Sequence, residues 1–123
     1  MAKILIVDDD HEFVGAVKTV LENSGHQVAA AYSRETGMDA CQNEKPDLLI
    51  IDVMMEQPDD GFTMVQNLRK QGVDKPILML TGISKVTGME FDKDSDMVPV
   101  DAFVDKPVLP GELLKKVNEL LKQ

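Results

Sequence analysis

Three consecutive aspartates, Asp8, Asp9 and Asp10, are the first residues whose types and spacing indicate chemistry. Carboxylates this close repel one another, by roughly 3 kcal/mol for a pair about 5 Å apart at an effective dielectric of about 20. A hard cation such as Mg²⁺ would relieve this repulsion, because it prefers oxygen ligands. Alternatively, Asp9 or Asp10 caps the next helix, with Glu12 completing a capping box that begins at Asp9. Residues 3–10 alone leave both interpretations, a cation site and a helix cap, open.

Further residues capable of chemistry follow later apolar runs in the chain. Asp52 comes near the end of one run, Thr81 directly follows the next, and Asp105 with Lys106 ends the last. If these runs are parallel strands of one sheet, their carboxyl ends meet at the same edge, where such sheets bind ligands. That edge would then carry acids, a hydroxyl and a lysine, which is far more specific than any of these residues alone.

The apolar pattern of the chain predicts the strands and helices that position these residues. Ile4 to Val7 is unbroken and mostly β-branched, which is typical of a strand buried on both faces. Strands that alternate with helices imply right-handed crossovers and a parallel sheet between two helix layers. Strands are expected at residues 4–7, 27–32, 48–53, 77–80 and 102–105, and helices at 10–24, 33–43, 61–71 and from 110 onwards. Gly37 is an unfavourable residue within the second of these helices.

Residues 83–100 have the least regular pattern. At most a weak or irregular fourth helix is expected there, because Gly88 and the clustered aspartates of residues 92–96 favour a loop. Such a segment buries too little apolar surface to offset its ordering entropy, so mobility is predicted. The aspartates do not form a calcium loop, since Met97 and Phe103 occupy the positions that require glycine and glutamate.

Length and composition indicate one soluble domain over residues 1–123. Apolar residues make up 43% and charged residues 28%, as in globular proteins. The net charge of −9 argues against direct binding of nucleic acid or of an anionic membrane. One cysteine, Cys41, excludes an internal disulfide and fits the reducing cytosol; it is expected to be a small buried residue. No signal peptide or membrane span is visible, so a cytoplasmic location is predicted.

The polar residues that follow the strands resemble a known set. Their order and spacing are similar to those in the receiver domain of two-component response regulators, as in stand-alone chemotaxis-type receivers. The resemblance covers nearly the whole chain and depends on Asp8, Asp9, Asp52, Thr81, Lys106 and Pro107. It implies a doubly wound, flavodoxin-like α/β/α fold with five parallel strands in the order 2-1-3-4-5.

This resemblance implies that Asp52 is the phosphoacceptor, a carboxylate nucleophile that takes a phosphoryl group from a sensor histidine kinase or a phosphotransfer protein. Asp8, Asp9, Asp52 and the backbone carbonyl of Met54 would bind Mg²⁺, or Mn²⁺ in its place. Phosphorylation would then switch contacts with a downstream target protein or an output domain. Activity would be limited to Mg²⁺-dependent self-phosphorylation and autodephosphorylation, so the chain is not expected to be an enzyme.

The remaining residues of the set also receive roles from the resemblance. Lys106 would contact Asp52 or the phosphoryl oxygens as a point charge. Thr81 would donate its hydroxyl to the phosphoryl group, and Thr81 and Phe103 would form the switch. The bond before Pro107 would be cis. The structural alternatives are that Thr81 only ends a strand, Lys106 is a solvated charge, and Phe103 is an ordinary core residue.

Two stretches depart from the family pattern. The loop from Asp52 to Gly61 is one residue longer than usual and its proline is displaced to Pro58. The stretch between Thr81 and Lys106 is also a few residues longer. Met54 and Ile83 are apolar where family members orient the attacking water, which predicts slow loss of the phosphoryl group.

Three other functions fit parts of the pattern. An aspartate-nucleophile phosphatase of the haloacid dehalogenase type would use Asp8 and Asp10, but Glu12 breaks its motif and no cap domain fits. A flavodoxin-like FMN protein would need a phosphate loop where the acids stand. A pseudo-receiver that is never phosphorylated is the third, and the complete acid, threonine and lysine set argues against it.

Overall fold

The computed structural model describes residues 2–53, 60–81, 100–105 and 108–122. Within these residues, five parallel strands form one sheet in the order β2-β1-β3-β4-β5, which confirms the predicted topology. The strands are β1 (Lys3–Val7), β2 (Gln27–Ala31), β3 (Leu48–Asp52), β4 (Ile77–Thr81) and β5 (Ala102–Asp105). The helices are α1 (His11–Asn23), α2 (Arg34–Glu44), α3 (Asp60–Lys70) and α5 (Pro110–Leu121).

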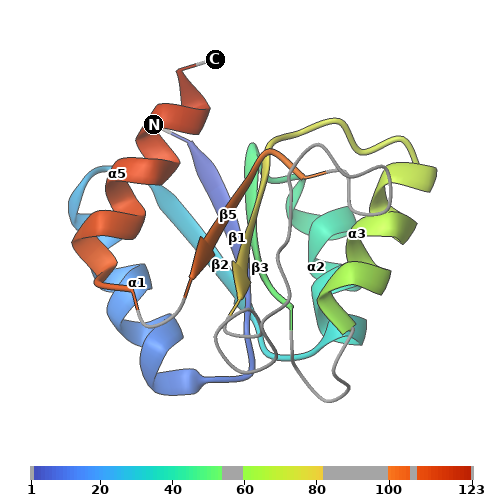
Figure 1. The fold of residues 1–123 in the computed structure, drawn as a ribbon, viewed down its shortest axis with the longest axis horizontal. Coiled ribbons are helices and arrows are strands. Elements are labelled where there is room, and N and C mark those ends of the chain that lie inside the picture. Colours follow the sequence, from blue (N-terminus) through green and yellow to red (C-terminus); the bar gives the residue numbers. More distant parts are fainter. Residues whose placement is uncertain (1, 54–59, 82–99, 106–107, 123) are drawn as a thin grey trace.

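The sheet lies between two helix layers. Helices α1 and α5 cover one face, and α2 and α3 cover the other (Figure 1). Side chains of β1 alternate between these layers: Ile4 and Ile6 pack on the α1 and α5 side, whereas Leu5 and Val7 pack on the α2 and α3 side. All four are fully buried, as the unbroken apolar run predicts. None of the helices in the described part of the chain has both the length and the apolar character that a bilayer crossing requires.

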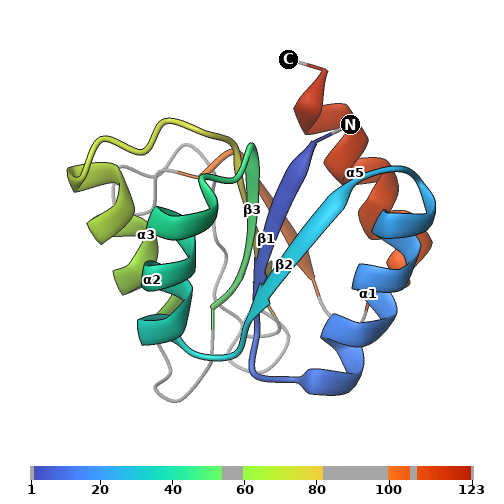
Figure 2. The ribbon, with the colours of Figure 1, turned by 180° about the vertical axis from the view of Figure 1, so that it is seen from behind.

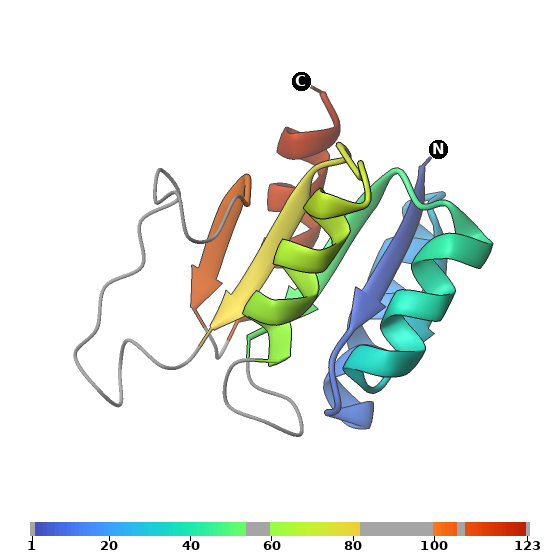
Figure 3. The same cartoon turned by 90° about the vertical axis from the view of Figure 1, so that its right-hand side faces the viewer.

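Register brings the carboxyl ends of the strands to one edge. Val7 pairs with both Ala31 and Ile51, Asp52 pairs with Leu80, and Thr81 comes one residue later at the end of β4. Figure 3 shows the arrowheads of β1, β4 and β5 at this edge. Among the described residues, Asp8, Asp52, Thr81 and Asp105 are therefore gathered on one side of the molecule.

The cap of α1 decides between the two aspartates that the sequence leaves open, and the capping box expected from Asp9 and Glu12 is wrong. Asp10, not Asp9, is the N-cap of α1, and its carboxylate accepts the N–H of Phe13 at 3.1 Å. The helix begins later because Asp10 first donates its own N–H to the Asp8 carboxylate at 3.0 Å, which fixes a turn there. At α2, Ser33 is the N-cap as predicted.

Gly37 lies inside α2 because the helix approaches β1 closely there. A Cβ atom at this position would lie 2.8 Å from Cγ1 of Val7 and 3.0 Å from Cε of Met64. Tertiary packing thus overrides the low helix propensity of glycine. Cys41, further along α2, is buried as predicted, and this burial raises the pKa of its thiol.

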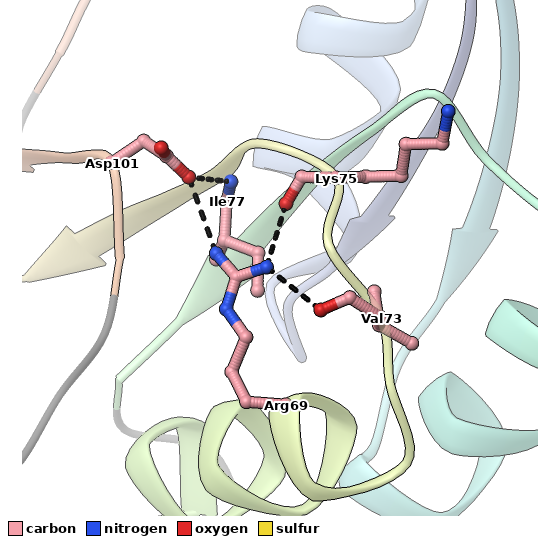
Figure 4. A network of polar contacts seen from close by, with 5 residues as sticks. All are labelled: Arg69, Val73, Lys75, Ile77 and Asp101. Atoms are coloured by element: carbon pink, nitrogen blue, oxygen red, sulfur yellow. Dashed lines mark hydrogen bonds and ion pairs between the residues drawn. The ribbon is translucent and has the colours of Figure 1, made fainter.

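Arg69 connects the amino ends of β4 and β5 at the opposite edge of the sheet. Its guanidinium donates to the carbonyls of Val73 and Lys75 at 3.0 and 2.9 Å and to the Asp101 carboxylate at 3.2 Å (Figure 4). The same carboxylate accepts the N–H of Ile77 at 2.8 Å. One planar guanidinium therefore joins α3, the turn before β4, and the start of β5.

We expect Arg69→Ala to lower the free energy of unfolding by about 2 kcal/mol, because it removes several charge-assisted hydrogen bonds at once. Arg69→Lys should restore little, since an ammonium group lacks the fork geometry. Urea unfolding measures both effects. Lys70→Ala, an exposed neighbour on the same helix, should change stability by less than about 0.5 kcal/mol. Equal losses in the two alanine variants would contradict a structural role of the network.

Candidate functional site

Three carboxylates lie together at the carboxyl edge of the sheet. Asp8 directly follows β1, Asp52 is the last residue of β3, and Asp9 lies in the loop that leads to α1. One oxygen from each side chain can be chosen so that all three lie within 4.8 Å of one another. Asp8 and Asp52 are only 0% and 6% exposed, whereas Asp9 is exposed. The structure thus brings the predicted acids together, two of them inside the protein and one at its surface.

Backbone hydrogen bonds fix two of these acids. The N–H of Asp8 donates to the carbonyl of Ala31 at 3.1 Å, which extends the β1–β2 pairing by one residue. The N–H of Val53 donates to the carbonyl of Leu80 at 2.9 Å, so the β3–β4 pairing continues past Asp52. Both acidic residues are consequently held by the sheet rather than by a loop.

The donor set fits a hard divalent cation. All three groups are carboxylates, and burial of two of them in proximity makes their mutual repulsion costly. The exposed Asp9 lies on the side that water can reach, and Mg²⁺ usually retains several water ligands. Asp8, Asp9 and Asp52 could therefore hold Mg²⁺ or Mn²⁺.

Thr81 is the next polar group along this edge. It is the last residue of β4, one position beyond the partner of Asp52, and it is 2% exposed. Phe103 lies in β5 opposite Met79, half-buried, and packs against the core on the α2 and α3 side. The structure therefore brings Thr81 to the edge with the acids, and Phe103 is part of the packing behind it. Their roles in a switch stay predictions.

Several predicted residues lie outside the described residues. They are Met54, whose carbonyl is a predicted metal ligand, Lys106, and Pro107 with its predicted cis bond. Predictions for Pro58 and for residues 83–99, including Ile83, also fall outside the described residues, whereas Val100, the last residue of the predicted irregular stretch, is described and buried in the core.

Gly61 is a site residue whose role the sequence did not reveal. It is the second residue of α3, and its N–H donates to the carbonyl of Val53 at 2.9 Å. A Cβ atom there would lie 2.2 Å from the backbone oxygen of Asp52 and 2.6 Å from Cα of Val53. The helix can thus approach the acceptor strand only because this residue has no side chain. An Asp-Gly pair at a helix start is the sole signal in the sequence, and it is a weak one.

A family model decides what this arrangement is. The model for the response regulator receiver domain matches residues 4–118. This chain belongs to the receiver domain family. The match spans β2 to β5, all of β1 except Lys3, and most of α5, and so includes every acid of the site.

Individual relatives of this receiver domain agree with the assignment. It is 35% identical to the alkaline phosphatase synthesis transcriptional regulatory protein PhoP of Bacillus subtilis and 32% identical to the regulatory protein VanR of Enterococcus faecium. Each alignment covers 98% of this chain, which spans 49% and 50% of those proteins. A CheY-like receiver domain protein from Methanospirillum hungatei matches with a TM-score of 0.83 and 28% identity, over 99% of this chain and 94% of that one. The fold and the family are thus supported by sequence and by structure.

Proposed function

We propose that this receiver domain accepts a phosphoryl group on Asp52 from a sensor histidine kinase or a phosphotransfer protein and thereby switches its protein contacts. The observation that carries this proposal is the placement of Asp52 at a strand end, against Asp8 and Asp9. A carboxylate that is nearly buried and held at the end of a strand has few possible directions of approach for a phosphodonor. The family assignment supports the same role.

In the transfer step, a carboxylate oxygen of Asp52 attacks the phosphorus of a phosphohistidine. An oxygen–phosphorus bond forms, the nitrogen–phosphorus bond breaks, and the imidazole leaves with the electron pair and takes up a proton. When bound by Asp8, Asp9 and Asp52, Mg²⁺ supplies positive charge that offsets the charge of the phosphoryl group. Asp52 becomes an acyl phosphate in this reaction.

Other residues of the edge act on the phosphoryl group after transfer. The hydroxyl of Thr81 donates a hydrogen bond to a phosphoryl oxygen, and Lys106 pairs with the group as a point charge. Thr81 and Phe103 then report the modification to the surface. The position of Thr81 at the end of the strand next to that of Asp52 supports its proposed hydrogen bond to the phosphoryl group.

The partners follow from the same proposal. The chain spans about half the length of the curated relatives it matches, and two of them are named as regulatory proteins. The receiver domain therefore acts on a downstream target protein or an output domain, and does not itself contact nucleic acid or membrane. Its activity is limited to taking the phosphoryl group from its phosphodonor and losing it again by autodephosphorylation, so it has no separate substrate. It works in the cytoplasm.

Incubation with acetyl phosphate and Mg²⁺, followed by intact mass measurement, tests the proposal. The protein should gain one phosphoryl group, and a chelator should prevent the gain. A protein that consumes acetyl phosphate in many turnovers without retaining the group would instead be a phosphatase. A protein that neither gains the group nor consumes the donor would be a pseudo-receiver, and either result would overturn the proposal.

Asp9→Ala should weaken Mg²⁺ binding on the order of tenfold, because it removes one oxygen ligand from a cluster of three. The same change relieves repulsion, so the metal-free variant should be at least as stable as the parent protein. Calorimetric Mg²⁺ titration and thermal unfolding without metal measure the two effects. A clearly lower melting temperature without metal would argue against a repulsive acid cluster.

A further inference from the structure

Two aromatic rings stack where the loop that carries Asp9 meets α1. The rings of His11 and Tyr32 have centroids 3.9 Å apart and planes that differ by 14°. His11 is the first residue of α1, and Tyr32 directly follows β2. Both residues are exposed, Tyr32 by 40%. A stack between two surface residues of different elements constrains those elements relative to each other.

This stack lies at one end of the loop that carries Asp9. The loop begins at Asp8, whose N–H donates to the carbonyl of Ala31 at 3.1 Å, and it ends at His11, which stacks on Tyr32. Both ends are therefore attached to consecutive residues at the end of β2. Figure 2 shows that β2 and the connection from β1 to α1 reach the same edge of the sheet. Asp9 lies between the two attachments.

We propose that Tyr32 is a positioning residue for the metal site: its stack on His11 holds the loop so that the Asp9 carboxylate stays beside Asp8 and Asp52. The inference rests on the proposed Mg²⁺ site. Asp8 and Asp52 are fixed by the sheet, whereas Asp9 is exposed and depends on its loop. A carboxylate ordered before the cation arrives loses less conformational entropy on binding, so preorganisation raises affinity.

The position of Tyr32 at the surface distinguishes this role from packing in the core. Tyr32 is not part of the buried core, and its neighbour Ser33 caps α2 through its own hydrogen bonds. Loss of the ring should therefore affect the acidic loop more than the overall stability. From the usual strength of an aromatic pair, Tyr32→Ala is expected to weaken Mg²⁺ binding about fivefold.

Amide NMR of the full chain tests the proposal with two readouts. One is the Mg²⁺ affinity, from shifts of the loop amides during titration. The other, which needs no metal, is the hydrogen exchange rate of the Asp10 amide, whose N–H donates to Asp8. The variants are Tyr32→Ala, Tyr32→Phe, His11→Ala and the double alanine variant, with thermal unfolding as a check that each is folded.

We expect Tyr32→Ala to exchange faster at Asp10 and to bind Mg²⁺ about fivefold more weakly, whereas Tyr32→Phe keeps the ring and both parent values. His11→Ala should have the same effects, and the double variant should show no further loss. Parent-like exchange and affinity in Tyr32→Ala, or additive losses in the double variant, would overturn the proposal. Absence of any Mg²⁺-dependent shift in the parent protein would instead overturn the metal site, and the exchange rates would then decide the positioning role alone.

Discussion

Asp52→Asn is expected to abolish phosphoryl uptake from acetyl phosphate while the domain remains folded. The amide has the same shape as the carboxylate but carries no negative charge, so it is a far weaker nucleophile for phosphorus. Asp52 is 6% exposed and lies beside two other acids, so the substitution also removes a repulsive buried charge. Stability without metal should therefore be equal to or above that of the parent protein. Intact mass after incubation with acetyl phosphate and Mg²⁺ measures uptake.

Asp74→Asn is a matched control for this experiment. Asp74 is an exposed aspartate just before β4, at the edge of the sheet opposite to the acid cluster. This variant should take up one phosphoryl group, as the parent protein does. Undiminished uptake by Asp52→Asn would show that another residue is the acceptor and would remove the main support for the proposed function.

The second large effect is expected from Gly61→Ala, which should lower the free energy of unfolding by about 3 kcal/mol. A methyl group there would lie 2.2 Å from the backbone oxygen of Asp52, so the helix or the strand end must move. Backbone atoms cannot rotate away as a side chain can, and the bond from the Gly61 N–H to Val53 would be strained or lost. Urea unfolding measures the change.

Gly15→Ala and Gly111→Ala provide the controls, because a Cβ atom at either position meets nothing within 4 Å. Gly15 lies within α1, so alanine there should raise stability by about 0.5 to 1 kcal/mol. Since the atoms that Gly61→Ala displaces belong to Asp52 and Val53, its folded fraction should also take up the phosphoryl group more slowly. Equal stability of all three variants would contradict the close approach of α3 to the acceptor strand.

The fold could be predicted because its signals are local and repeated. The unbroken apolar run of β1 distinguishes a strand buried on both faces from a surface strand, and the alternation with helices then leaves few topologies. The start of α1 could not be located to the residue, since Asp9 and Asp10 are equally good caps. The carboxylate of Asp8 decides between them by accepting the N–H of Asp10, a contact that the sequence does not show.

The acids of the site could also be predicted, since each follows a strand and the carboxyl ends of parallel strands share an edge. The surroundings of the acids could not. Gly61 and Tyr32 act through contacts with residues distant in the chain, at Asp52 and His11. Periodicity identifies neither residue, and the only local signal is the weak Asp-Gly pair at Gly61. Gly37 shows the same limit, because its low helix propensity argues against the helix whose close packing it permits.

The Arg69 network has a geometric consequence for β5. Asp101 holds the first residue of β4 and the guanidinium together, so the amino end of β5 is fixed at one point. A tilt of β5 relative to β4 must then pivot about Asp101, and the displacement grows with distance along the strand. At a rise of about 3.3 Å per residue, the backbone of Asp105 lies about 13 Å from this pivot, and that of Phe103 about half as far. A small rotation of the strand therefore displaces the backbone most at the edge where the acids lie and least at the edge that Arg69 holds.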